Sequence, residues 1–438
     1  MYIDPIVVQY PEALEQDRFV IATYYCATKP ETNIIKFAAA IGIEQSCGTW
    51  IKVPQETEEI REKCIGRLVG VYETPAYQIG LPEGISERHL IIRIAYPWTN
   101  FGDQFAMLLS TVIGEVAGSG KVKLLDLEFP DSFLQKFSGP KFGIKGIRAL
   151  LGVYDRPLLN NMIKPCTGMS PAVTAELAYE SAVGGVDIIK DDELIANPDH
   201  CPLTERVKHV MAALKQADDE KGEKTLYTVN ITDRPDRLRE NAYRALEAGA
   251  NALMVNYGTV GLDATRMLTE DQNINVPILG HPAYNGAVYE SAWSGISVGL
   301  IGAKLPRLSG ADMIISFSPY GKLTMLMDTF IDAGYKMIAP LGKIKPVFSM
   351  PGGGTTQGHV EDIVKKFGID VIIASGAGIH GHPMGTQAGA RAFRQAIAAA
   401  VDGIPTAEAA QEHPELAAAL SLWGFYQEGK SGIFDLKG

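Results

Sequence analysis

Several features that would assign a chain to a special class are missing from this sequence. No apolar run reaches the length of about 18 residues that a membrane-spanning helix needs. Lys and Arg nowhere cluster and the net charge is −11, which argues against a nucleic-acid partner. The five cysteines are odd in number and lack C-x-x-C spacing, which excludes a disulfide framework and a cysteine zinc site. The start of the chain lacks the basic and apolar regions of a signal peptide, so we expect a cytoplasmic protein.

What is present is the composition of a soluble globular enzyme, with 46% hydrophobic and 21% charged residues in a chain of 438. That length predicts more than one domain. Strand-like and helix-like segments are mixed up to about residue 148, which predicts an N-terminal α+β domain over 1–148. We expect a regular α/β region over 149–402 and a helical C-terminal extension over 403–438.

The regular region alternates short apolar runs with amphipathic segments, which is the pattern of βα units around a parallel sheet. Eight such runs predict a (β/α)₈ TIM barrel, with an open doubly wound sheet as the alternative. The runs lie at 161–165, 186–190, 226–230, 252–256, 277–281, 312–316, 346–350 and 370–374.

Polar residues end every predicted strand, and the active site of a barrel lies at these carboxyl ends. In GGVDIIKDDE (184–193), period-two alternation places Lys190 and Asp192 on one side, with Glu193 just beyond. Two carboxylates suit Mg²⁺. A lysine carbamylated by CO₂ would add a third anionic ligand. The alternative interpretation is a solvated charge run.

Two glycine-rich loops follow the last two strands, at 349–354 and 375–385, where barrels often bind phosphate through backbone N–H groups. His380 and His382 lie in the second loop. In such a turn we expect them to hydrogen-bond the loop, with a role as ligand or base as the alternative.

Together these motifs resemble the RuBisCO superfamily over nearly the whole chain. The resemblance implies that Lys190 is the carbamylated lysine, that Asp192 and Glu193 are further Mg²⁺ ligands, and that Lys164 moves protons. It also implies that Lys322 lies in a mobile loop and closes over a substrate carboxylate or an incoming CO₂. It also implies further roles for His281 as a catalytic residue, for a segment that reaches the neighbouring subunit's site in a homodimer (Glu44, Thr49, Trp50), and for a substrate or phosphate site (Ser349, Gly352, Gly353, Gly376, Ala377).

We expect departures from the RuBisCO pattern to change the substrate and the reaction. Pro282 replaces an arginine and Ile315 a histidine, both of which bind a second phosphate, so the resemblance implies a substrate with one phosphate. Cys166 replaces a second active-site lysine and Met107 an asparagine. We therefore expect a RuBisCO-like protein of form IV that does not fix CO₂.

Three reactions through an enediolate stay open. The first is decarboxylation of 3-oxo-isoapionate 4-phosphate, or its cleavage by a transcarboxylase/hydrolase, with Lys322 holding the carboxylate. The second is the 2,3-diketo-5-methylthiopentyl-1-phosphate enolase of methionine salvage, which uses a lysine base where this chain has Glu115. The third is a ketose-phosphate isomerase, for which Lys164 and His281 would suffice. We place the decarboxylase first, and a non-enzymatic family member last because the metal residues are all present.

Overall fold

The computed structural model describes residues 4–49, 51, 53–321 and 325–426. The chain divides into two compact units. The N-terminal unit comprises Met1–Phe137, Tyr284–Gly302 and Leu341–Ile344, and the barrel unit comprises Ser138–Ala283, Ala303–Pro340 and Lys345–Gly438. No helix among the described residues is long and apolar enough to span a membrane.

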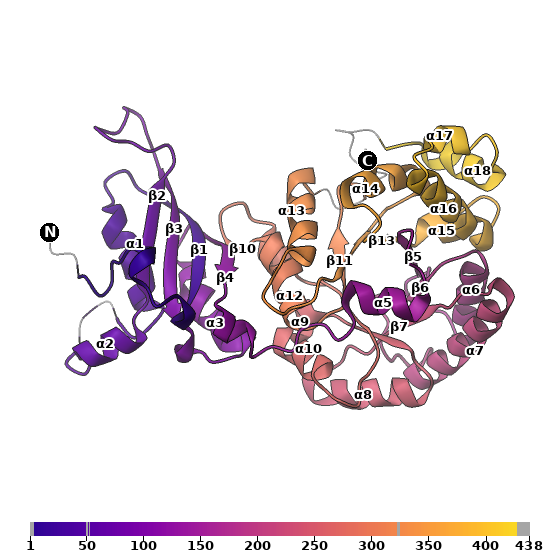
Figure 1. Cartoon of the computed structure of the whole chain (residues 1–438), viewed down its shortest axis with the longest axis horizontal. Helices are drawn as coiled ribbons and strands as arrows, with labels where there is room; N and C mark the ends of the chain where they lie inside the picture. The colour runs from indigo at the N-terminus through magenta and orange to yellow at the C-terminus, as the bar shows by residue number, and fades with distance from the viewer. Residues whose placement is uncertain (1–3, 50, 52, 322–324, 427–438) are drawn as a thin grey trace. The chain divides into compact units, whose positions relative to one another are not determined.

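The N-terminal unit is built on a five-stranded sheet with the order β10-β4-β1-β3-β2 (Figure 1). Its central strand alternates buried and half-buried residues and pairs antiparallel with β3, from Phe19 opposite Pro97 to Thr28 opposite Arg88. The strands are β1 (Phe19–Thr28), β2 (Arg67–Glu73), β3 (Arg88–Pro97), β4 (Val122–Glu128) and β10 (Gly295–Ile296). The helices are α1 (Ile34–Glu44), α2 (Glu58–Cys64), α3 (Phe105–Ile113), α4 (Asp131–Leu134) and α11 (Gly286–Tyr289).

The segment 284–302 lies far along the chain from the rest of this unit, yet it belongs to the same sheet. Its short strand β10 pairs parallel with β4, where Gly295 lies opposite Lys123 and Ile296 opposite Leu124. The sequence pattern does not separate this segment from the barrel region, because a two-residue strand carries no periodic signal.

The barrel unit contains eight parallel strands in the order β12-β11-β9-β8-β7-β6-β5-β13. A parallel bridge between Ser349 and Val371 joins the two ends of this sheet, so the barrel is nearly closed. The predicted (β/α)₈ fold is thereby confirmed. The strands are β5 (Leu158–Met162), β6 (Ile188–Lys190), β7 (Leu226–Asn230), β8 (Ala252–Val255), β9 (Ile278–Gly280), β11 (Met313–Phe317), β12 (Phe348–Gly352) and β13 (Ile372–Ser375).

Most helices of this unit follow the strands and cover the outside of the barrel, whereas the helix Gly143–Leu151 precedes the first strand and packs against the core inside the barrel (Figure 1). The helices of this unit are α5 (Gly143–Leu151), α6 (Pro171–Val183), α7 (Leu203–Lys221), α8 (Pro235–Glu247), α9 (Tyr257–Val260), α10 (Leu262–Thr269), α12 (Leu305–Leu308), α13 (Met327–Ile338), α14 (Val360–Phe367), α15 (Ala377–His380), α16 (Thr386–Val401), α17 (Thr406–Ala409) and α18 (Pro414–Trp423). The last two lie in the stretch that was expected to be a helical extension.

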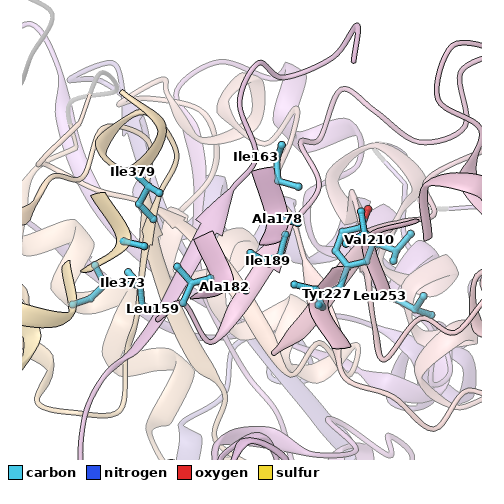
Figure 2. Close-up of a cluster of buried hydrophobic side chains, with 14 of the residues drawn as sticks. Leu159, Ile163, Ala178, Ala182, Ile189, Val210, Tyr227, Leu253, Ile373 and Ile379 are labelled. Carbon is cyan, nitrogen blue, oxygen red and sulfur yellow. The ribbon is translucent and has the colours of Figure 1, made fainter. Parts of the chain in front are cut away.

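Strand alternation divides the buried side chains into an inner and an outer core. Leu158 and Ile188 belong to the cluster inside the barrel, which α5 joins through Ile144 and Ile147. Their neighbours along the strands belong to the layer between the strands and the helices, which Figure 2 shows with Leu159 and Ile189 among its members. Because Lys190 follows Ile188 by two residues, the same alternation directs it toward the barrel interior.

Candidate active site

The segment after β6 directs its acidic side chains to opposite sides. Lys190 is fully buried, and the Asp191 carboxylate accepts hydrogen bonds from Tyr227 Oη at 2.6 Å and from the backbone N of Asn230 at 3.0 Å. Asp191 also pairs with Arg206 of α7, whose Nη2 lies 3.1 Å from Asp191 Oδ2. The predicted alternation is therefore present, with Asp191 anchored in the layer between the strands and the helices.

Five of the predicted site residues come together at the carboxyl ends of the strands. Lys190 Nζ lies 3.1 Å from Glu193 Oε2, which is 3.3 Å from His281 Nε2. Lys164 Nζ donates to Asp192 Oδ2 at 2.5 Å. The side chains thus form a compact cluster of two cations, two carboxylates and one imidazole, most of it buried.

The hydrogen bonds of His281 define which of its nitrogens carries the proton. Nδ1 accepts from the backbone N of Ala283 at 3.1 Å, so Nε2 carries the hydrogen and donates it toward Glu193. Burial and the nearby Lys190 charge lower the pKa of His281, which keeps the imidazole neutral. A neutral His281 is therefore a fixed hydrogen-bond donor at the site.

The charges of the cluster stabilise each other. Burial alone would raise the pKa of Glu193, but the hydrogen bond from His281 and the Lys190 charge lower it well below its usual range. Burial alone would lower the pKa of Lys164, but its hydrogen bonds to Asp192 and Cys166 raise it. Glu193 is therefore ionised, and Lys164 is held as an ammonium group beside Asp192.

A divalent cation would find two carboxylates here and would need a further ligand. Among the described residues no group of three or more His, Cys, Asp or Glu side chains could hold a metal. The nitrogen of Lys190 lies beside Glu193, and as an ammonium group it cannot ligate. The donor set fits a hard cation once this nitrogen carries a carbamate, which supplies anionic oxygen.

At the glycine-rich loops the backbone passes close to other residues of the site. A Cβ at Gly376 would lie 2.9 Å from Cε of Lys164 and 3.0 Å from the carbonyl oxygen of Met162, so a larger residue here would push the Lys164 side chain out of its present position. Gly353 has a φ of +90°, which favours glycine. Gly352 ends β12, and Ala377 begins α15.

The serine and histidine side chains of these loops hydrogen-bond mainly to neighbouring elements of the barrel unit. Ser349 Oγ lies 3.0 Å from Ser316 Oγ. His380 Nε2 lies 3.0 Å from Asn161 Oδ1, and its pKa is lowered to about 4 by burial and the Lys164 charge. His382 Nε2 lies 2.9 Å from the carbonyl oxygen of Glu415, and its Nδ1 accepts from the backbone N of Met384. Only His382 hydrogen-bonds the loop as expected, through Met384, whereas His380 contacts Asn161 of β5 and Thr386 at the start of α16.

The other predicted site residues lie in the N-terminal unit or outside the residues that the structure describes. Lys322 and Trp50 lie outside the described residues. Glu44 ends α1 and Thr49 follows in the next loop, and both belong to the N-terminal unit. Their contribution to a neighbouring subunit's site stays a prediction. Glu115 is exposed in the same unit.

The residues at three positions that depart from the RuBisCO pattern have different surroundings. Ile315 is buried in the apolar core inside the barrel, and its side chain cannot donate a hydrogen bond to a second phosphate. Cys166 Sγ accepts a hydrogen bond from Lys164 Nζ at 3.1 Å. Met107 lies in α3 of the N-terminal unit and is exposed.

Sequence reasoning missed the polar residues that support the cluster from outside. Arg206 is fully buried, and although burial alone would lower its pKa, the Asp191 charge and Tyr227 raise it. Thr232 donates to Asn230 Oδ1 at 2.6 Å. The only available signal was an arginine with hydrophobic neighbours in a helical segment, and that signal is weak.

Two family models match the chain. They are the N-terminal domain of the ribulose bisphosphate carboxylase large chain, over residues 9–133, and its catalytic domain, over residues 143–423. The chain belongs to the RuBisCO large-chain family, as a RuBisCO-like (form IV) member. The resemblance inferred from the sequence motifs is confirmed.

Relatives of this RuBisCO-like chain include proteins with and without an assigned reaction. A ribulose bisphosphate carboxylase-like protein of Archaeoglobus fulgidus is 49% identical over 393 residues, 90% of each chain. A 2,3-diketo-5-methylthiopentyl-1-phosphate enolase of Geobacillus thermodenitrificans is 38% identical and covers 92% of this chain and 98% of that one. The RuBisCO-like chain is thus an enzyme of this superfamily.

Solved structures agree with this assignment. A RuBisCO-like protein (MtnW) from Alicyclobacillus acidocaldarius superposes with a TM-score of 0.85 at 36% identity, covering 93% of this chain and 100% of that one. The octameric RuBisCO of Pyrococcus horikoshii gives a TM-score of 0.86 at 30% identity, over 95% and 96% of the two chains.

Proposed function

We propose that this enzyme forms an enolate of a small phosphorylated keto substrate at the carboxyl ends of the barrel strands, either by removing a proton beside the ketone or by releasing CO₂ from a β-keto acid. The observation that supports this proposal is the cluster in which Lys164 lies against Asp192, and Glu193 lies between Lys190 and His281. It combines a candidate proton carrier, a fixed hydrogen-bond donor and a carboxylate pair within a few ångströms.

Mg²⁺ is the proposed cofactor, with Asp192, Glu193 and the carbamate of Lys190 as its ligands. When bound, Mg²⁺ would stabilise negative charge that develops on the substrate oxygen. The protein residues would do the rest. As an ammonium group, Lys164 would return a proton to the substrate carbon after CO₂ release. To remove a proton it would have to be a neutral amine, which Asp192 would favour by binding the cation in place of Lys164. The Nε2–H of His281 would donate to a substrate oxygen on the Glu193 side.

We propose a substrate with one phosphate, held by backbone N–H groups of the loops that contain Gly352, Gly353 and Gly376, with Ser349 and Ala377 beside them. The apolar environment of Ile315 supports a single phosphate, because a second dianion would need charge-assisted partners. CO₂ fixation is not part of the proposal.

Two substrates are the leading candidates, each with its own support. 2,3-Diketo-5-methylthiopentyl-1-phosphate is favoured by the enolase names of relatives such as that of Bacillus licheniformis, which is 39% identical over 92% of this chain. 3-Oxo-isoapionate 4-phosphate is favoured by Lys322, which we propose as the partner of a substrate carboxylate, and by Glu115 in place of a lysine base. The relatives support the enolase at least as well as the decarboxylase, so the two should be tested side by side.

Product analysis separates these reactions. Enzyme preincubated with Mg²⁺ and bicarbonate is given each substrate, with Lys190→Ala as the control. Release of CO₂ only from the apionate substrate, lost in the control, establishes a decarboxylase. An enol product from the diketo substrate establishes the enolase, with Glu115→Gln then testing the base. If the wild type turns over neither substrate, both assignments fail and ketose-phosphate isomerisation is the next assay.

We also propose that the working unit is at least a homodimer in the cytoplasm, in which Glu44, Thr49 and Trp50 complete the site of a neighbouring subunit. Support comes from related assemblies, including a RuBisCO of Hyperthermus butylicus that is described as dimeric, at 30% identity and a TM-score of 0.83. Sedimentation of the purified protein would test this assembly.

A further inference from the structure

A closed ring of hydrogen bonds connects the ends of β7 and β8 to the backbone of the proposed metal ligands. The backbone N of Asn256 donates to Thr232 Oγ1 at 3.0 Å, and Thr232 Oγ1 donates to Asn230 Oδ1 at 2.6 Å. Both amide groups then donate to the same carbonyl oxygen, that of Glu193, from Asn230 Nδ2 at 3.3 Å and from Asn256 Nδ2 at 3.1 Å.

The ring is itself fixed at several points. The backbone N of Asn230 donates to Asp191 Oδ2 at 3.0 Å, and its Nδ2 also reaches the carbonyl oxygen of Asp192 at 3.3 Å. The carbonyl oxygen of Asn256 accepts from the backbone N of Val260 at 3.1 Å, in the first turn after β8. The ring therefore ties the 191–193 segment to two neighbouring strands.

This arrangement holds the backbone of the proposed ligands and does not involve their carboxylates. The Asp192 and Glu193 carboxylates point to Lys164, Lys190 and His281, while the ring holds the carbonyl oxygens. Replacing groups that orient metal ligands from behind typically lowers metal affinity by about 10–100-fold.

The second polar atom of the Asn256 amide, which lies outside the ring, argues against a purely stabilising role. Asn256 Oδ1 is buried and has no hydrogen-bond partner among the residues that the structure describes. A buried carbonyl oxygen without a partner destabilises the fold. An apolar side chain would avoid that cost, so the amide at 256 is better explained by what its other half does, which is to hold Glu193.

We propose that Asn230, Thr232 and Asn256 are positioning residues that preset Asp192 and Glu193 for a divalent cation. The inference rests on the proposed metal site. Thr232 offers the sharpest test, because it touches neither carboxylate and acts only through the two asparagines. Thr232→Val removes the hydroxyl at nearly constant shape, and Thr232→Ser keeps the hydroxyl and is the matched control.

The experiment measures the rise of the thermal unfolding midpoint as Mg²⁺ is titrated in the presence of bicarbonate, for both variants and the wild type. The inference predicts that Thr232→Val needs about tenfold more Mg²⁺ for half of the rise. Thr232→Ser should stay within about twofold of the wild type. Asn256→Ala, which removes the other donor to Glu193, should behave like Thr232→Val.

The outcomes separate this inference from the proposed metal site. A wild type without any Mg²⁺-dependent rise overturns the metal site, and the inference with it. A wild type that responds while Thr232→Val and Asn256→Ala respond at the same Mg²⁺ concentration overturns the inference alone. The same holds if the variants melt earlier without metal but keep the wild-type Mg²⁺ dependence, since the ring would then be only structural.

Discussion

Replacing Arg206 by methionine should destabilise the barrel unit strongly, although this side chain lies outside the predicted site. Arg206 is fully buried and pairs with Asp191, from which Nη2 lies 3.1 Å and Nε 3.2 Å away. It also donates to the carbonyl oxygens of Cys201 at 2.8 Å and Ala196 at 2.7 Å. Methionine fills most of the volume and makes none of these bonds.

The expected magnitude follows from what remains around Asp191. Removing one partner of a buried ion pair costs about 3–5 kcal/mol, because the other charge stays buried. Tyr227 and the backbone N of Asn230 still donate to Asp191, which favours the lower half of that range. At about 2 °C per kcal/mol for a unit of this size, the unfolding midpoint should fall by roughly 6–8 °C.

Differential scanning calorimetry measures this midpoint, and an exposed ion pair supplies the control. Arg234 pairs with Asp236 at 2.8 Å, and both side chains are more than half exposed (67% and 59%). Arg234→Met should therefore cost less than about 1 kcal/mol. The double variant Arg206→Met with Asp191→Asn should recover part of the loss, because it removes the unpaired charge.

If Arg206→Met lowers the free energy of unfolding by less than about 1 kcal/mol, as little as the exposed control Arg234→Met does, this reasoning is refuted. It would show that the Asp191 carboxylate is not held by a buried counter-ion. The anchoring of the ligand segment through Asp191 would then have to be abandoned.

Three further predictions concern single side chains. Burial lowers the pKa of His359 from 6.5 to about 4, so the unfolded chain binds the proton at a higher pH than the folded chain does. The free energy of unfolding should therefore fall as the pH drops from 6.5 toward 4. Urea unfolding at several pH values should show a weaker pH dependence for His359→Asn than for the wild type. Gly376→Ala should lower kcat by on the order of tenfold, because its Cβ would meet Lys164 Cε at 2.9 Å, and steady-state kinetics would show unchanged kcat if this contact is unimportant. Asn160 is fully buried and its amide has no partner among the described residues, so Asn160→Ala should change the free energy of unfolding by less than about 1 kcal/mol, whereas Leu158→Ala should cost about 2–5 kcal/mol.

The barrel could be predicted from the sequence because its strands are buried on both faces and appear as apolar runs between helical segments. The first strand was displaced. It was expected at 161–165 and runs over Leu158–Met162. The apolar pair at 158–159 was overlooked because Asn160 and Asn161 follow it, yet both asparagines are buried in the strand.

The facing of Lys190, Asp191 and Asp192 could also be predicted, since alternation along one strand fixes the side on which each residue lies. Contacts between side chains of different strands could not be predicted from the sequence. The 2.5 Å hydrogen bond from Lys164 to Asp192 depends on the pairing of β5 with β6, and the ring through Thr232 depends on β7 and β8. Polarity at a strand end was also an ambiguous signal, because Ser316 and Ser349 hydrogen-bond to each other.

The measurement that tests the central claim most directly is exchange of substrate C–H hydrogen for deuterium in D₂O, followed by proton NMR with Mg²⁺ and bicarbonate present. The account predicts exchange or product formation with one of the two candidate substrates, and its loss in both Lys190→Ala and Asp192→Asn. Exchange that persists undiminished in these variants would contradict the account, because the enolate would then form without the proposed metal site.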